Sequence, residues 1–255
     1  MRWFLALVLA LLAGAGALYG LTDGFTAVTA ESARRQAVAR QPRPIHDARI
    51  INTKDGAASL LGELEADGRV AIVNFFYTRC ISLCLAQGSV TQRVQEAIAA
   101  QGLQSQVRLL SISFDSRDRA PDLGRYASSM RADPAIWRFW SFEQSRQRDA
   151  LLRQFGITVI PAPFGDFEHN AALHVVTPDG RLAGIVDLDE PGLALALAKK
   201  LSAPGKIRLA GQATALNESH AGAAAVVPQA TGRKGSSHHR RGLAGTGGSS
   251  QKDPS

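Results

Sequence analysis

Residues 70–77 form a short run, rich in β-branched and aromatic side chains and apolar on both faces, with the sequence Val-Ala-Ile-Val-Asn-Phe-Phe-Tyr. Apolar positions on both faces are typical of a strand buried inside a sheet. Farther on, Val90, Val94 and Ile98 recur every four residues up to Gly102, which indicates an amphipathic helix. The core is therefore expected to contain a strand, a short loop and a helix in that order.

The alternation of strands and helices continues along the chain. We expect strands at residues 107–114 and 136–142, and helices at 121–130 and 144–155, the second of which ends at Gly156. Such an order indicates βαβ units and therefore a parallel core.

The last part of the core has a different pattern. Two apolar runs, 171–176 and 182–186, flank the turn sequence Thr-Pro-Asp-Gly-Arg at 177–181 and are expected to pair as a hairpin. A helix is expected at 191–200, with proline in its first turn and lysines in its last. A βαβ start with a hairpin and helix at the end predicts an α/β, thioredoxin-like fold, a central mixed β-sheet flanked by helices.

The N-terminal residues predict export. Residues 1–21 are almost wholly apolar after Arg2, and about 20 such residues are enough for a membrane-spanning helix. We expect an uncleaved N-terminal membrane anchor or, because Val28-Thr29-Ala30 has small residues at a signal peptidase's spacing, a cleaved signal and a secreted soluble periplasmic form. The anchored form would lie in the inner (cytoplasmic) membrane with its domain facing the periplasm.

Three further segments follow from composition. Residues 22–47 contain Gln-Pro-Arg-Pro and little hydrophobic pattern, and are expected to be a linker. Residues 48–202 are long enough for one domain with its own core. Residues 203–255 are rich in Gly, Ala, Ser and basic side chains and are expected to be a disordered basic tail. Because the tail holds seven Lys or Arg and two acids, it supplies five of the seven net positive charges, so the high charge does not indicate nucleic-acid binding.

Cys80 and Cys84 are the only cysteines in the chain, and they lie between the first strand and the helix after it. The spacing suits a redox pair, a disulfide or a pair of metal ligands, while a buried small hydrophobe is the alternative without chemistry. A helix N-terminus favours the thiolate form, particularly for Cys84. Soft thiolates suit copper(I), whereas zinc usually takes four ligands.

A third ligand would be a histidine, of which the chain has six. His46 lies in the expected linker, His174 lies within an expected strand, and three others lie in the tail at positions 220, 238 and 239. His169 lies on an expected loop just before that strand. From chain position it is either a ligand that reaches the cysteine loop or a solvated loop histidine.

Three motifs resemble, in this order, those of the Sco/SenC proteins: Asn-Phe-Phe-Tyr-Thr-Arg-Cys at 74–80 with Cys84, Ser-Phe-Asp at 113–115 with Pro121, and Glu-His-Asn-Ala at 168–171 before Pro-Asp-Gly-Arg at 178–181. The resemblance spans residues 48–200. It implies a membrane-tethered thioredoxin-fold protein that binds copper and helps to assemble the dinuclear copper centre of cytochrome c oxidase. It also implies that Cys80, Cys84 and His169 are the copper ligands.

The chain departs from the family pattern around the cysteines. Sco-type proteins often have proline after each cysteine and an acid between them, where this sequence has Ile81, Leu85 and Ser82. Of the family's acidic pair, Asp115 is in place and Asp118 is one position away. Asp115 is a candidate for supporting the ligands or docking a partner, and its alternative is an ordinary turn residue at a strand end.

The resemblance implies a copper(I) metallochaperone, with copper(II) as a further state, that delivers copper to the copper-bearing subunit of cytochrome c oxidase or prepares its cysteines. A periplasmic copper donor or thiol reductant would be a second partner. The alternatives are a membrane-tethered thiol-disulfide oxidoreductase, with Cys80 and Cys84 as its redox pair, and a copper or redox sensor.

Overall fold

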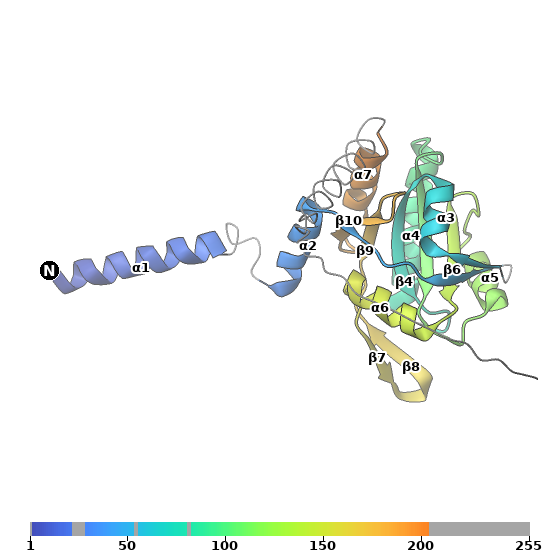
Figure 1. Ribbon diagram of the computed structural model, residues 1–255, viewed down its shortest axis with the longest axis horizontal. Coiled ribbons are helices and arrows are strands. Elements are labelled where there is room, and N and C mark those ends of the chain that lie inside the picture. Colours follow the sequence, from blue (N-terminus) through green and yellow to red (C-terminus); the bar gives the residue numbers. More distant parts are fainter. Residues whose placement is uncertain (1, 22–28, 54–55, 81–82, 204–255) are drawn as a thin grey trace, which may run out of the picture. The chain divides into compact units, whose positions relative to one another are not determined.

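The computed structural model describes residues 2–21, 29–53, 56–80 and 83–203, with the side chains of 18, 21 and 83–85 left out (Figure 1). The chain divides into two units, residues 1–210 and 211–255. The second unit lies outside the described residues, as does nearly all of the expected disordered tail, so that expectation stays a prediction.

An eight-stranded mixed sheet forms the core, with its strands in the order β1-β10-β9-β4-β5-β6-β2-β3. The three central strands β4, β5 and β6 are parallel, and every other pairing in this sheet is antiparallel. The strands are Arg43–Pro44 (β1), Arg49–Asn52 (β2), Ala57–Ser59 (β3), Val70–Phe76 (β4), Val107–Ser113 (β5), Trp137–Phe142 (β6), Leu173–Val176 (β9) and Arg181–Val186 (β10).

Helices cover both faces of this sheet (Figure 1). On one face, Asn74 of β4 bonds Thr91 of α4, and Phe76 contacts Tyr126 of α5. On the other, Phe75 packs edge-on against Phe155 of α6. The helices of the domain are Ala30–Arg40 (α2), Leu60–Asp67 (α3), Leu83–Ala100 (α4), Ala120–Ser129 (α5), Ser145–Phe155 (α6) and Pro191–Ser202 (α7).

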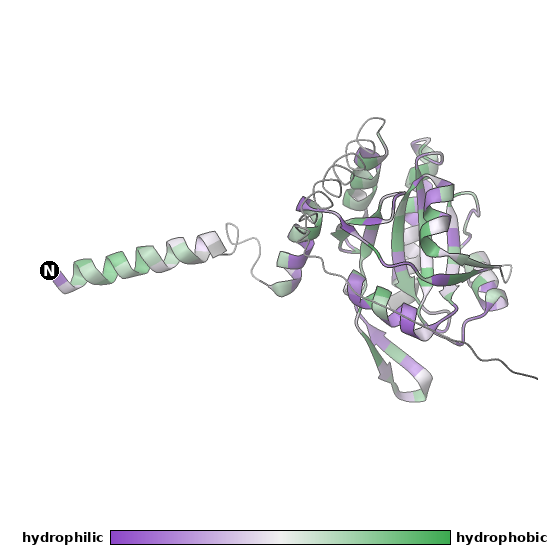
Figure 2. Ribbon diagram, viewed as in Figure 1, coloured by the Kyte–Doolittle hydropathy of each residue, from purple (hydrophilic) through white to green (hydrophobic). Residues whose placement is uncertain are grey.

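The central strands β4 and β5 belong to the buried core of the sheet. Every residue of β4 and β5 is buried, and Figure 2 shows hydrophobic colouring on β4 in the middle of the sheet. This agrees with the expectation of a strand that is apolar on both faces. The expected strands and helices at 107–114, 121–130, 136–142, 144–155 and 191–200 are all confirmed, with ends that move by a few residues.

The expected hairpin is also confirmed. β9 and β10 pair antiparallel, and the Gly180 N–H donates to Thr177 O across the turn at 2.9 Å. Gly180 has a φ of 72°, a conformation that glycine adopts without strain.

The segment expected to be a linker, 22–47, is ordered against the domain over residues 30–47. These residues contain α2 and β1. Val38 of α2 and Ile45 are buried, and β1 pairs with β10 at the sheet edge. The prediction was wrong for this part, because the apolar residues that attach it are single and widely spaced and give no period.

Residues 48–69, for which the sequence pattern predicted no element, form β2, β3 and α3. The helix has recognisable ends: the Ser59 hydroxyl accepts from the Gly62 N–H, and Gly68 ends the helix with a φ of 72°. These are the standard N-cap and C-cap signals.

Near the N-terminus, residues Arg2–Leu21 form helix α1. Among the residues that the structure describes, no helix is long and apolar enough to cross a membrane. The anchor or signal segment expected at 1–21 stays a prediction.

A charged cluster lies inside the sheet layer near the start of β5. The Arg108 side chain is fully buried and stacks 5.1 Å from the Trp140 ring centre. The Arg108 Nη1 atom lies 3.0 Å from Asp67 Oδ2, so the two side chains form an ion pair. The angle does not suit a hydrogen bond, and none of the three guanidinium nitrogens has one. Asp67 also binds Arg69 Nε at 2.6 Å, so one carboxylate balances a buried guanidinium and its neighbour.

His174 of β9 lies in the core and not at the surface. Its Nδ1 lies 3.3 Å from Val73 O and its Nε2 lies 3.1 Å from Phe155 O. Burial lowers the pKa of His174 to about 4, because the interior disfavours the charged ring.

This burial predicts a pH dependence of stability. The unfolded chain takes up the His174 proton below a pKa of about 6.5, whereas the folded protein takes it up only near 4. The contribution is complete above pH 6.5 and is lost as the pH falls toward 4, a change of roughly 3 kcal/mol in unfolding free energy. An NMR titration of the His174 ring is expected to show a neutral imidazole down to about pH 4; a midpoint near 6.5 would contradict this.

Candidate metal centre

The two cysteines lie at the carboxyl end of β4, where the chain passes from the sheet to α4. Cys80 is buried, and its backbone N–H donates to Tyr77 O at 3.4 Å. Cys84 is the second residue of α4, which confirms its expected place at a helix N-terminus, although its side chain lies outside the described residues.

His169 lies on a strand and not on the expected loop. It is the last residue of β8 (Asp166–His169), which pairs antiparallel with β7 (Val159–Ala162) in a separate two-stranded sheet. The pattern there was hidden by the prolines at 161 and 163. The Asn170 side chain closes the base of this hairpin by accepting from the Thr158 N–H at 2.7 Å and donating to Gly156 O at 2.8 Å.

The His169 ring has a defined protonation state. Its Nδ1 lies 3.0 Å from Asn170 O, and since a carbonyl can only accept, Nδ1 carries the proton. Burial lowers the pKa of His169 below its ordinary value, although the Asn170 carbonyl acts in the opposite direction. The neutral ring therefore has its lone pair on Nε2, the form that a metal requires.

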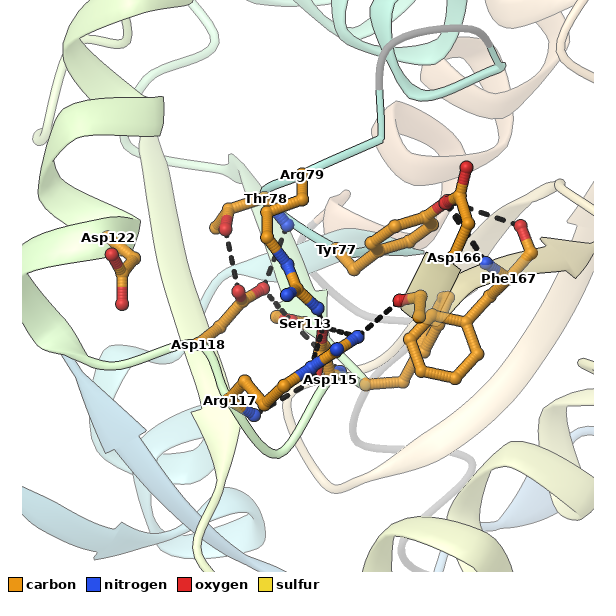
Figure 3. A network of polar contacts seen from close by, with 12 residues as sticks. Tyr77, Thr78, Arg79, Ser113, Asp115, Arg117, Asp118, Asp122, Asp166 and Phe167 are labelled. Atoms are coloured by element: carbon orange, nitrogen blue, oxygen red, sulfur yellow. Dashed lines mark hydrogen bonds and ion pairs between the residues drawn. The ribbon is translucent and has the colours of Figure 1, made fainter. Parts of the chain in front are cut away.

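Tyr77 joins the cysteine loop to the hairpin. Its ring packs edge-on against His169, with 6.1 Å between ring centres, and Phe114 packs against the same histidine at 4.9 Å. The Tyr77 hydroxyl bonds the Asp166 carboxylate, and the Phe167 N–H lies 3.3 Å from it (Figure 3). Tyr77 thus attaches β8, through its side chain, to the start of the turn that leads to Cys80.

Asp118 fixes the next residue of the cysteine loop. Its carboxylate accepts from the Thr78 N–H at 2.8 Å and from the Thr78 hydroxyl at 2.6 Å, and it also bonds the Ser113 hydroxyl (Figure 3). Asp118 is buried. The loop before Cys80 is therefore attached to the end of β5.

Asp115 holds two arginines. Its buried carboxylate pairs with Arg79, the residue before Cys80, and with Arg117, whose Nε and Nη2 each lie 3.0 Å from one of its oxygens (Figure 3). Burial by itself would raise the pKa of Asp115, but the hydrogen bonds from Arg117 and Arg79 hold it below its ordinary value. Asp115 thus stays ionised and holds the loop that precedes the cysteine.

Tyr77 contacts both Cys80, through a backbone hydrogen bond, and His169, through its ring. By contrast, His46 is exposed and His174 is in the core. The tail histidines lie outside the described residues. Within the described part of the chain no three His, Cys, Asp or Glu side chains are grouped to hold a metal. Because that part lacks the Cys84 side chain, the set Cys80, Cys84 and His169 stays a prediction.

The roles of Tyr77 and Asp118 in the site were not predicted from the sequence. Tyr77 looked like the last residue of a buried strand, and its hydroxyl partner is 89 positions away. The only available signal was its position immediately before the cysteine loop. For Asp118, the signal was a second acid three residues after Asp115, which turns back to the same loop.

The model of the SCO1/SenC family matches residues 52–202, more than half of the chain. The chain belongs to the SCO1/SenC family. This confirms the resemblance drawn from the cysteine, aspartate and histidine motifs. Membership places the chain in a family associated with copper and with assembly of cytochrome c oxidase.

Solved structures of SCO1/SenC proteins share the fold. A SCO1/SenC lipoprotein from Bacillus anthracis str. Ames is 16% identical with a TM-score of 0.57, and covers 64% of this chain and 98% of its own. BsSco, a Sco cytochrome c oxidase assembly protein with a disulfide switch, is 20% identical with a TM-score of 0.55, over 64% and 96%. Yeast Sco1 with copper bound is 13% identical with a TM-score of 0.53, and covers 66% of this chain and 94% of its own.

At these identities the solved structures show the fold alone, which is the expected α/β, thioredoxin-like arrangement of a mixed sheet with helices on both faces. No protein with a curated description matches the sequence.

Proposed function

We propose that this protein is a copper(I)-binding metallochaperone for the dinuclear copper site of cytochrome c oxidase. The observation that carries the proposal is the Tyr77 contact, which holds the strand that ends in His169 beside the turn that leads to Cys80, in a chain of the SCO1/SenC family. Yeast Sco1, which has the same fold, has been solved with copper bound.

The candidate residues fit copper(I) chemically. Two thiolates and one neutral imidazole form a soft set that copper(I) accepts with three ligands. In this proposal, Cys80, Cys84 and His169 bind the ion, which is the protein's cargo. Asp118 and Asp115 hold the loop before Cys80, and the Asn170 carbonyl orients His169 so that Nε2 faces the ion.

Delivery would proceed by ligand exchange, with thiolates of the recipient replacing the protein's ligands one at a time. The expected recipient is the copper-bearing subunit of cytochrome c oxidase, and the expected copper source is a periplasmic donor. We further propose that residues 1–21 direct export, so that the domain works in the periplasm as an anchored or a released form.

A second candidate function is thiol-disulfide exchange, which the cysteine at the N-terminus of α4 favours. One thiolate would attack a disulfide of the target, and the other would displace the target thiolate, so that the target leaves reduced and Cys80–Cys84 becomes a disulfide. BsSco, a relative by fold, has a disulfide switch.

Cytochrome oxidase activity in a deletion strain tests the proposal. We expect the activity to fall and to recover partly with added copper. Recovery is expected with the wild-type gene and not with Cys80→Ala or His169→Ala. A dithiol reductase needs no histidine, so full recovery by His169→Ala would favour the oxidoreductase. Unchanged oxidase activity in the deletion strain would favour the sensor.

A further inference from the structure

Exposed hydrophobic side chains are concentrated on the β7–β8 hairpin. Among the described residues after α1, the large hydrophobic side chains that are exposed are Ile160, Phe164 and Leu193, so two of the three lie on this hairpin. Phe164 is fully exposed. The prolines at 161 and 163 are exposed beside it, so the tip presents a compact apolar surface.

The tip holds Phe164 in a costly conformation. The hairpin turns through Pro163–Gly165, where Phe164 has φ 61° and ψ 18°. Bulky side chains rarely adopt a positive φ, because the Cβ crowds the backbone. Since the exposed ring makes no stabilising contact with the fold, this residue is better explained by binding than by folding.

The tip is connected to the candidate metal centre on two sides. Arg117 donates to Gly165 O, stacks 5.5 Å from the Phe167 ring centre and binds Asp115, which in turn binds Arg79 beside Cys80. Four residues separate Phe164 from His169, the last three of them in β8, so roughly 17 Å of chain at most joins the two. This distance is within the reach of one standard protein interface.

The charges on the hairpin select among partners. Residues 158–170 contain Asp166 and Glu168 and no Lys or Arg, and Arg117, the cation that bonds Gly165 at the tip, is paired with Asp115. Anionic lipid surfaces attract basic segments, and two copies of an acidic hairpin repel each other. An apolar tip with acidic residues beside it therefore fits a protein that has an apolar socket with basic residues around it.

We propose that the hairpin tip, Ile160 to Phe164, is the docking surface for the copper recipient, whose apolar socket takes up the Phe164 ring and so places the recipient's thiols beside Cys80 and His169. The inference rests on the proposed function. It assigns selection of the recipient to a surface that is separate from the residues that hold the metal.

The test uses the full-length protein in mild detergent and the apo, reduced soluble domain of the cytochrome c oxidase copper-bearing subunit from the same organism. Phe164→Gly removes the ring and accepts the positive φ, so the fold is retained. We expect the dissociation constant to rise about tenfold or more, as for a buried aromatic anchor, and copper transfer at low recipient concentration to slow in proportion. Leu193→Ala, the matched control, removes an exposed leucine outside the hairpin and is expected to change neither value.

The number of copper ions bound per chain, measured in the same samples, tests the proposed function separately from the docking surface. Failure of the parent protein to bind copper would overturn the proposed function. Normal copper binding with the same recipient affinity for the parent and Phe164→Gly would overturn the docking surface alone. It would also be overturned if Phe164→Gly abolished binding to phosphatidylcholine–phosphatidylglycerol vesicles, or converted a dimer to a monomer, without a change in recipient affinity.

Discussion

Alanine at Cys80, Cys84 or His169 is expected to abolish tight binding of one copper(I) per chain. Removing a group that merely supports a metal ligand weakens affinity by about 10- to 100-fold, so the loss of a ligand from a three-ligand site is expected to exceed about 100-fold. Within the part of the chain that the structure describes, His174 cannot replace a lost ligand, since it is enclosed in the core by Val73 and Phe155.

The measurement is anaerobic competition for copper(I) with a chromophoric chelator. His46→Ala is the matched control, because the His46 side chain is exposed and only its backbone N–H bonds Gln154. The copper(I) affinity of this variant is expected to equal that of the parent protein. A His169→Ala variant that binds copper as tightly as the parent would disprove the ligand assignment. Retained binding in Cys80→Ala would instead place the metal elsewhere.

Asp67→Asn is expected to destabilise the fold by about 3–5 kcal/mol, because it leaves the buried Arg108 guanidinium without its counter-charge. The three guanidinium nitrogens have no hydrogen bond to compensate. Although burial would raise the pKa of Asp67, its bonds to Arg69 and the charge of Arg108 hold that pKa below its ordinary value, so the ion pair persists down to acidic pH.

Urea unfolding at pH 7 measures this effect. The control is Glu143→Gln, which removes an exposed ion pair with Arg49 and is expected to cost less than about 1 kcal/mol. Equal losses in the two variants would show that Arg108 draws no stability from Asp67. A double variant, Asp67→Asn with Arg108→Met, is expected to regain most of the loss, because it removes the isolated buried charge.

Sequence patterns predicted the parts of the fold that have a regular period or strong turn residues. β4 is apolar at every position except Asn74, α4 repeats every four residues, and the β9–β10 turn contains Asp-Gly. Two of the elements that were missed have neither feature: α2 buries only Val38 among its residues, and β7 is interrupted by Pro161. Such segments are ordered by contacts with residues far away in the chain, which a local pattern does not contain.

The candidate site divides in the same way. The cysteines and His169 could be named because metal and redox chemistry need particular side chains, and few are present. Of the supports, only Asp115 was named, and that came from the family resemblance. Tyr77 and Asp118 act through partners on other elements, and nothing in their residue type distinguishes them from an ordinary strand-end tyrosine or turn aspartate.

The closure made by Asn170 has a consequence for how this domain can diverge. Because Thr158 and Asn170 are joined by one side chain, the chain leaves the core and returns to it at nearly the same place. Lengthening or shortening a segment whose ends already meet adds little closure entropy and does not disturb the strands beneath it. Homologous domains can therefore change the length and residues of this hairpin independently of the sheet, and acquire a new partner while keeping the same core.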